Sequence, residues 1–149
     1  MRLCIQRVSR ATVRVGERQV GSIGSGLLVL IGVGLNDSEA DAQYLADKTA
    51  ELRIFPDHEG KMNLSLVDTG GHVLVISQFT LYGDCRKGRR PSWHLAAEPD
   101  LGNSLYLRYC QLLEAKGIRV ERGEFGAMMD VELVNAGPVT MLLDSGREF

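Results

Sequence analysis

The chain has 149 residues, of which 44% are hydrophobic and 24% are charged, and its formal net charge at pH 7 is −2. This length predicts a single domain over residues 1–149, and the small negative charge argues against a protein that coats nucleic acid through bulk positive charge. The longest apolar run, residues 27–31, is far shorter than the ~20 residues that a membrane-spanning helix needs, so no membrane partner is expected.

The three cysteines, Cys4, Cys85 and Cys110, are odd in number and do not have the spacing of a metal site. They predict free thiols in a reducing compartment. The N-terminal residues alternate between charged and apolar types and do not resemble a signal peptide. We therefore expect a cytoplasmic protein.

The first third of the chain predicts several short strands and one helix. Residues 3–8, 11–15 and 19–23 have the composition of short strands, with turn residues between them. Residues 27–33 are almost continuously apolar, which indicates a central strand buried on both faces. Residues 36–53 predict an amphipathic helix that begins after Asp37 or Ser38, with Asp41 placed to complete a capping box. The paired glycines beside the central strand do not form a dinucleotide-binding motif, because a strand follows them rather than a helix.

The rest of the chain continues this mixture. An irregular edge segment at residues 61–67 leads to a short buried strand at residues 73–76, and a second helix begins at Pro99 and ends at Gly117. The last strands are predicted at residues 118–121, 130–134 and 138–143. This order predicts an α/β fold of mixed sheets with two helices packed on one side, in β/β/α layers.

Polar residues directly follow the buried strand at residues 73–76. The sequence Ser-Gln-Phe-Thr at residues 77–80 places two hydroxyls and an amide where the strand ends. These groups can form the floor of a binding site, or they can simply satisfy backbone groups at the end of the strand. A second polar interruption, Asn-Ala-Gly-Pro-Val-Thr at residues 135–140, has the composition of an ordinary turn.

Together, these two segments resemble the two signature motifs of the D-aminoacyl-tRNA deacylase family. The resemblance covers nearly the whole chain, in the family's order and length. Further matches are Ile5-Gln6-Arg7-Val8, Gly26–Leu30, Arg53-Ile54-Phe55, Gly60–Leu64 and Arg90-Pro91-Ser92.

The resemblance implies an enzyme that hydrolyses the ester bond of D-aminoacyl-tRNA and of mischarged glycyl-tRNA, and that proofreads by rejecting L-amino acids. It implies a homodimer in which a cis Gly137-Pro138 bond, held by Arg7, enters the active site of the partner subunit. The implied catalytic residues are Ser77, Gln78, Phe79 and Thr80.

Two further groups of residues are candidates for tRNA binding. By resemblance, Phe125 packs against the terminal adenine with Met129 nearby, although a core phenylalanine explains the residue equally well. Four cations in the five residues 86–90 form either a solvated loop or a phosphate-binding patch. These cations are Arg86, Lys87, Arg89 and Arg90.

None of the motifs contains an obvious general base. His58, His72 and His94 belong to no motif, and no spacing typical of a metal site or a paired-carboxylate site occurs, so we expect no metal and no cofactor. An aminoacyl-tRNA ester is already activated, and its vicinal ribose hydroxyl can assist the hydrolysis, so a substrate-assisted reaction suits this sequence, while the hydroxyl of Thr80 is a candidate nucleophile. The alternative is a tRNA- or RNA-binding module without catalysis. Against it, the sequence lacks the paired exposed aromatic residues that stack bases in common RNA-binding modules.

Overall fold

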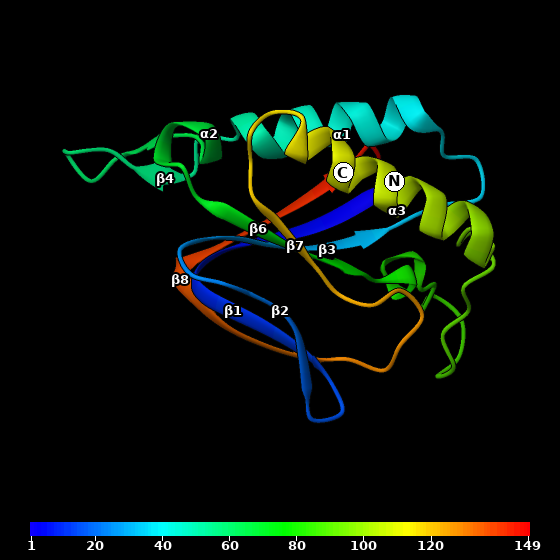
Figure 1. Ribbon diagram of the computed structural model, residues 1–149. Helices are drawn as coiled ribbons and strands as arrows, with labels where there is room; N and C mark the ends of the chain where they lie inside the picture. The colour runs from blue at the N-terminus through cyan, green and yellow to red at the C-terminus, as the bar shows by residue number, and fades with distance from the viewer.

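A six-stranded mixed sheet forms the centre of the computed structural model, which describes residues 1–149 (Figure 1). The strands run in the order β2 (Arg18–Ile23), β1 (Arg2–Val15), β3 (Gly26–Gly32), β6 (His72–Ser77) and β7 (Val120–Arg122), and β8 (Asp130–Asp144) pairs with β1. The β1 strand pairs antiparallel with its three partners, whereas β3, β6 and β7 are parallel. The predicted α/β class with a mixed sheet is confirmed.

Two helices, α1 (Glu39–Glu51) and α3 (Pro99–Glu114), cover one face of this sheet (Figure 1). The predicted capping box begins α1, where the backbone N–H of Ser38 donates to the carboxylate of Asp41 at 2.8 Å. The two helices meet at the buried Tyr109, whose hydroxyl lies 2.7 Å from the hydroxyl of Thr49. The helices therefore form one continuous layer over the core.

The sheet folds over on itself, and this produces the predicted β/β/α layers from one sheet rather than two. Along β3, Leu27, Val29 and Ile31 pack against the helices, whereas Leu28 points to the other side. There it joins a second cluster from β1, β2 and β6, which lies between the two halves of the sheet. Both faces of β3 are thus buried, which explains its continuous apolar sequence. The second cluster contains Val8, Ala11, Val13, Ile23, Leu28, Leu74 and Ile76.

Two predicted strand boundaries are wrong. The predicted strands at residues 3–8 and 11–15 are parts of the single strand β1, and those at 130–134 and 138–143 are parts of β8. The β1–β8 ladder continues through both apparent breaks as irregularities in its register, because the two strands bend together and bulges absorb the extra residues.

Smaller elements complete the chain. The predicted edge segment at residues 61–67 is instead a short hairpin, β4 (Phe55–Pro56) with β5 (Met62–Leu64), followed by the one-turn helix α2 (Leu66–Thr69). After β6 comes a 3-10 helix, η1 (Phe79–Tyr82). None of the helices has the length and apolar composition that crossing a membrane requires.

Candidate functional site

A cavity of about 580 Å³ opens where β6 and β7 end. Parallel strands end at the same edge of a sheet, and ligands of α/β proteins commonly bind outside these carboxyl ends. The walls come from the end of β6, the start of η1, the loop before α3 and the loop between β7 and β8. The lining residues are Ile76, Ser77, Gln78, Phe79, Ala97, Pro99, Phe125, Gly126, Ala127, Met128, Met129 and Val131.

The chain turns sharply at the floor of this cavity. The N–H of Gln78 donates to the carbonyl of Ile31 at 2.7 Å, after which η1 leads the chain away from the sheet. This close approach favours a glycine at position 32, since a Cβ there would lie only 3.0 Å from the carbonyl oxygen of Gln78. The N–H groups of Phe79 and Thr80 begin η1 and donate to no carbonyl of the chain. Two backbone donors are therefore free beside the cavity.

The side chains of the Ser-Gln-Phe-Thr motif divide between the cavity and its rim. Ser77, Gln78 and Phe79 line the cavity. Thr80 lies on η1 outside the lining, and its hydroxyl oxygen accepts a hydrogen bond from the side-chain amide of Gln78. The structure thus brings the motif together and holds the Thr80 side chain in a defined position.

Phe125 forms the opposite wall. Its ring centroid lies 6.0 Å from that of Tyr106, and a Cβ on Gly102 would lie 3.4 Å from its ring. The hydroxyl of Tyr106 in turn donates to the carbonyl of Val75 at 3.1 Å. Phe125 is therefore supported from behind while 36% of it remains exposed, which argues against the core interpretation. Met129 lines the cavity beside it.

None of the lining residues carries an ionisable side chain. The three histidines lie elsewhere: His58 is in the β4–β5 loop, His72 begins β6 at the end away from Ser77, and His94 pairs through Nδ1 with the hydroxyl of Ser92 at 3.0 Å. Nor does any group of three His, Cys, Asp or Glu side chains have the geometry of a metal site. The cavity can bind and position a substrate, but it contains no side chain that accepts a proton readily at neutral pH.

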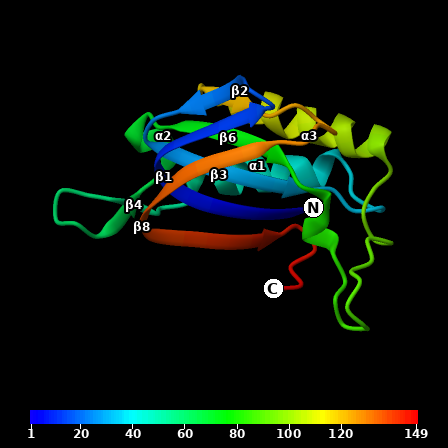
Figure 2. The same cartoon turned by 90° about the horizontal axis from the view of Figure 1, so that it is seen from below.

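Arg7 on β1 and Gly137 and Pro138 on β8, two strands that run side by side (Figure 2), are not among the residues that line the cavity. Arg7 pairs with Leu27 at the start of β3, whereas Gln78 bonds to Ile31 near its end. The four intervening steps along the strand correspond to about 13 Å. The Gly137-Pro138 peptide bond is cis.

The bulge that contains Gly137 and Pro138 is braced from two sides. On β1, Arg7 alone faces residues 136–139, and its Nε donates to the carbonyl of Ala136 at 3.0 Å. Within β8, the side chain of Asn135 accepts from the N–H of Val139 and donates to the hydroxyl of Thr140, both at 3.0 Å. The conformation of this turn is therefore fixed by side chains of its own motif and by Arg7.

The four predicted cations lie on an exposed loop beyond the cavity. Backbone hydrogen bonds of 2.8 and 3.1 Å between Asp84 and Ser92 close this loop. Arg86 binds the carboxylate of Asp84 through two nitrogens, which holds the pKa of Asp84 well below its usual range. Lys87, Arg89 and Arg90 form no ion pair. Three of the four cations are thus free to meet an anionic partner.

The sequence matches the family model described as D-Tyr-tRNA(Tyr) deacylase over residues 4–144. The chain belongs to the D-aminoacyl-tRNA deacylase family. A D-aminoacyl-tRNA deacylase from Thermotoga petrophila is 59% identical over the full length of both chains. The predicted family and its enzyme class are confirmed. A relative from Bacillus subtilis, named an inactive D-aminoacyl-tRNA deacylase, is 61% identical, and the match covers 87% of this chain and 98% of that protein.

Solved structures also match this deacylase-family fold. A c-Myc DNA unwinding element binding protein superposes with a TM-score of 0.91 at 37% identity, covering 97% of this chain and 98% of that one. A probable eukaryotic D-amino acid tRNA deacylase gives a TM-score of 0.83 at 21% identity, with coverage of 95% and 97%. The fold is therefore shared well beyond close sequence similarity.

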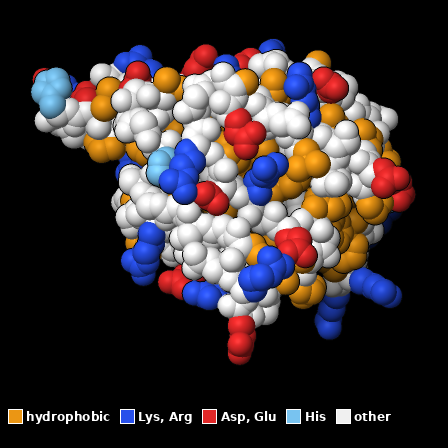
Figure 3. All heavy atoms as spheres, in the orientation of Figure 1, with side chains coloured by type: hydrophobic (Ala, Val, Ile, Leu, Met, Phe, Trp, Pro, Cys, Tyr) orange, Lys and Arg blue, Asp and Glu red, His pale blue; other side chains and the backbone are white.

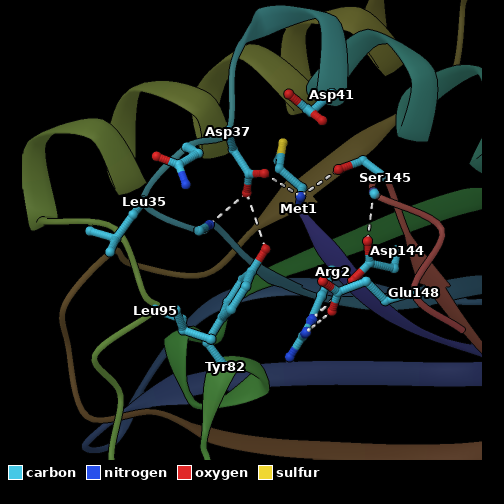
Figure 4. Close-up of a pocket in the computed structure, with 13 residues that line it drawn as sticks. Met1, Arg2, Leu35, Asp37, Asp41, Tyr82, Leu95, Asp144, Ser145 and Glu148 are labelled. Atoms are coloured by element: carbon cyan, nitrogen blue, oxygen red, sulfur yellow. Dashed lines mark hydrogen bonds and ion pairs between the residues drawn. The ribbon is translucent and has the colours of Figure 1, made fainter.

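A second cavity of this deacylase-family chain, about 220 Å³, lies beside the Tyr82 end of η1 and has an acidic lining (Figure 4). Four carboxylates line it, which makes it unsuited to an RNA phosphate. Three of them are already paired, since Asp37 binds the amino group of Met1 at 2.6 Å, and Arg2 binds both Asp144 at 3.0 Å and Glu148 at 2.8 Å. The four are Asp37, Asp41, Asp144 and Glu148.

Arg2 connects this acidic cavity to the main site. Its guanidinium lies 4.5 Å from the ring centroid of Tyr82 and donates to the carbonyl of Leu81 at 3.2 Å. Burial, reinforced by Asp37, raises the pKa of Tyr82, so its hydroxyl remains a hydrogen-bond donor to that carboxylate. Arg2 therefore holds the C-terminal end of η1 through Leu81 and Tyr82, a role for which the sequence contains no signal.

Proposed function

We propose that this chain hydrolyses the ester bond between a D-amino acid and tRNA, and that it also releases glycine from mischarged tRNA. One observation carries the proposal: the cavity beside residues 77–79, in a member of this family, has no ionisable side chain. Such a cavity cannot activate water for a stable bond, but an aminoacyl ester is labile and needs mainly positioning and stabilisation of an oxyanion.

The proposed arrangement uses both walls of the cavity. The terminal adenine packs against Phe125 and Met129, and the ester carbonyl lies over η1. The free N–H groups of Phe79 and Thr80 donate to the oxyanion that forms when water attacks the carbonyl carbon. The ester C–O bond then breaks, and the ribose oxygen takes up a proton.

The vicinal ribose hydroxyl assists this proton transfer, because the protein offers no side chain for it. The nearby hydroxyls belong to Ser77, which lines the cavity, and to Thr80, and neither is hydrogen-bonded to a histidine or carboxylate; the Thr80 hydroxyl already accepts from Gln78 while Thr80 lies outside the cavity lining. We therefore assign Thr80 an orienting role rather than that of a nucleophile. The parent protein should cleave a tRNA that lacks the vicinal hydroxyl more slowly than the Thr80→Ala variant cleaves the complete substrate.

The active unit in this proposal is a homodimer in which each copy supplies Gly137-Pro138 to the cavity of the other. The separation of these residues from the cavity within one chain supports the assignment. β8 also pairs only with β1, so its outer edge is open, and Leu142 on this strand is 59% exposed. The backbone of the turn would leave no room for an L side chain, so selectivity would arise from exclusion.

A monomeric variant tests the dimer. Leu142→Arg places a charge on the exposed face of β8, and Val67→Arg, at an exposed apolar residue of α2, is the matched control. We expect only the first to shift the sedimentation coefficient towards a monomer and to lose D-over-L selectivity. A monomer that cleaves D- over L-aminoacyl-tRNA at the parent ratio would overturn the cross-subunit arrangement.

The function itself is tested by incubating the protein with D-aminoacyl-, L-aminoacyl- and glycyl-tRNA and measuring the ester that remains. Loss of the D and glycyl esters alone supports the proposal. Binding of tRNA without cleavage of any ester would favour the non-catalytic alternative, and the relative from Bacillus subtilis is named inactive. The cytoplasmic location stays a prediction.

A further inference from the structure

An exposed aromatic pair stands at the rim of the cavity, contrary to the expectation from the sequence that no such pair exists. Phe79 and Trp93 are 57% and 39% exposed, and their ring centroids lie 5.7 Å apart at an interplanar angle of 64°. Phe79 lines the cavity, whereas Trp93 lies outside it. The aromatic surface therefore continues beyond the space proposed for the terminal adenosine.

Trp93 is held in place by the backbone around it. A Cβ on Gly83 would lie 3.4 Å from the indole nitrogen, so the ring packs directly on the chain. The Asp84–Ser92 bridge fixes the preceding residue, and the carbonyl of Trp93 accepts from the N–H of Ala96 at 2.9 Å. A ring positioned in advance loses little conformational entropy when a partner stacks on it.

The charge next to this pair indicates the kind of partner. Trp93 directly follows the loop that carries the three unpaired cations at residues 87, 89 and 90. Figure 3 shows hydrophobic side chains gathered over the region of η1 and the β7–β8 loop, with Lys or Arg side chains projecting beyond them. Aromatic surfaces beside positive charge are the usual means of binding single-stranded nucleic acid.

We propose that Trp93, together with Phe79, stacks the base that precedes the terminal adenosine in the single-stranded 3′ end of tRNA. This inference rests on the proposed function, because that function places the terminal adenosine in the cavity. The single strand then runs from Phe125 past Phe79 to Trp93, and its phosphates continue towards the loop of cations. Trp93 thereby contributes to substrate binding without contacting the ester.

The chain itself supplies the probe, because Trp93 is its only tryptophan. Titration with the trinucleotide CCA should quench the fluorescence of Trp93. A matched trinucleotide with an abasic middle position should bind about 5- to 150-fold more weakly, the range expected for the loss of one stacked base. Equal affinities and equal quenching for the two trinucleotides would overturn the proposal.

Measuring single variants of Trp93 with both the intact and the abasic trinucleotide separates stacking from a structural role. Trp93→Leu should weaken binding of labelled CCA, measured by anisotropy, and should abolish the difference between the intact and abasic trinucleotides. Trp93→Phe should keep most of that difference. Leu95→Ala is the control, since Leu95 is an apolar neighbour that is 42% exposed and should affect neither trinucleotide. An undiminished difference in Trp93→Leu would show that the base binds elsewhere.

Deacylation kinetics distinguish this inference from the proposed function. Trp93→Leu should raise KM for D-aminoacyl-tRNA with little change in kcat or in the D-over-L ratio. If the parent protein cleaves no ester but still discriminates the two trinucleotides, the proposed function fails and the stacking site stands. If the activity lost in Trp93→Leu depends on the size of the amino acid, the aromatic pair contacts the amino-acid side chain instead. If Trp93→Leu dissociates the dimer, the pair contacts the second copy of the chain instead.

Discussion

Arg7 donates a hydrogen bond from Nε to the carbonyl oxygen of Ala136 at 3.0 Å, and through a second nitrogen it binds the carbonyl of Ile54. One side chain on β1 thus ties the bulge of β8 to the segment that follows α1. Because the planar guanidinium has several donors in a fixed arrangement, it can satisfy two carbonyls at once. The position of Gly137 and Pro138 therefore depends on this residue.

Replacing Arg7 with Ala should loosen the turn and admit L-aminoacyl-tRNA. Each tenfold loss of D-over-L discrimination corresponds to about 1.4 kcal/mol. The measurement is deacylation of matched D and L substrates, together with unfolding in denaturant, where we expect a loss of about 1–3 kcal/mol from the missing hydrogen bonds. Arg7→Lys keeps the charge but cannot contact both carbonyls. The bracing role would be contradicted if Arg7→Ala and Arg7→Lys both kept the D-over-L selectivity of the parent protein.

Gly137→Ala should reduce cleavage of D-aminoacyl-tRNA and destabilise the fold. The backbone of Gly137 has φ of 125°, and a Cβ there would lie 2.6 Å from Nη2 of Arg7. Gly16→Ala is the control, because Gly16 also has a positive φ of 57° but its Cβ would meet nothing within 4 Å. A comparable loss of activity in both variants would point to general destabilisation rather than to obstruction at the turn.

Thr80→Ala should retain much of the activity. Removal of a true nucleophile from a catalytic triad costs far more than the loss of one orienting hydroxyl, so we expect a fall in kcat well below about 10³-fold. Single-turnover kinetics with saturating enzyme measure the chemical step directly. Complete inactivity of a folded Thr80→Ala variant that still binds tRNA, with recovery in Thr80→Ser, would instead identify Thr80 as the nucleophile.

Changing Arg89 and Arg90 to Glu should weaken tRNA binding and flatten its dependence on salt. Each lost phosphate contact reduces the slope of log K against log salt by about 1, since fewer counterions are released. The D-over-L ratio should not change, because phosphate contacts carry no information about the amino acid. Arg86→Gln is the control, as Arg86 is already bound to Asp84 and should contribute less. If the double variant binds tRNA with unaltered affinity, the loop is simply solvated and does not contact the phosphates.

Tyr106 should stabilise the protein in a pH-dependent way. Burial raises the pKa of its hydroxyl, which donates to the carbonyl of Val75 beneath Phe125. Because the pKa of this hydroxyl is higher in the folded than in the unfolded protein, its contribution to stability is complete below the unfolded pKa of about 10. That contribution is lost as the pH rises above about 10 towards the folded pKa. The difference in unfolding free energy between the parent and Tyr106→Phe should therefore shrink above pH 10. Urea titrations at pH 8, 10 and 11 measure it, and a constant difference would contradict the assignment.

Local sequence chemistry predicted the elements that obey one clear pattern. The continuous apolar run of β3 and the capping box of α1 both appear where expected. The predicted breaks at residues 9–10 and 135–137 are misleading, because turn residues inside a strand mean either a strand end or a bulge, and only the partner strand decides between them. The long β1–β8 pair is such a tertiary outcome.

The candidate site shows the same division. Ser77, Gln78, Phe79, Phe125 and Met129 were found through motifs and do line one cavity. Trp93 and Arg2 were missed, since an isolated aromatic or charged residue has no periodicity to mark it. The glycines at 32, 34 and 83 indicate close contacts, but a sequence does not state what approaches them.

The uncharged wall of the main cavity also bears on the breadth of proofreading. A D-aspartyl ester and a D-lysyl ester would meet the same neutral surroundings there, so neither would be favoured by electrostatic attraction nor excluded by repulsion. One enzyme of this design would serve acidic, basic and apolar amino acids alike. A cell would then need no separate hydrolase for each mischarged amino acid, and the presence or absence of an L side chain would decide which esters are destroyed.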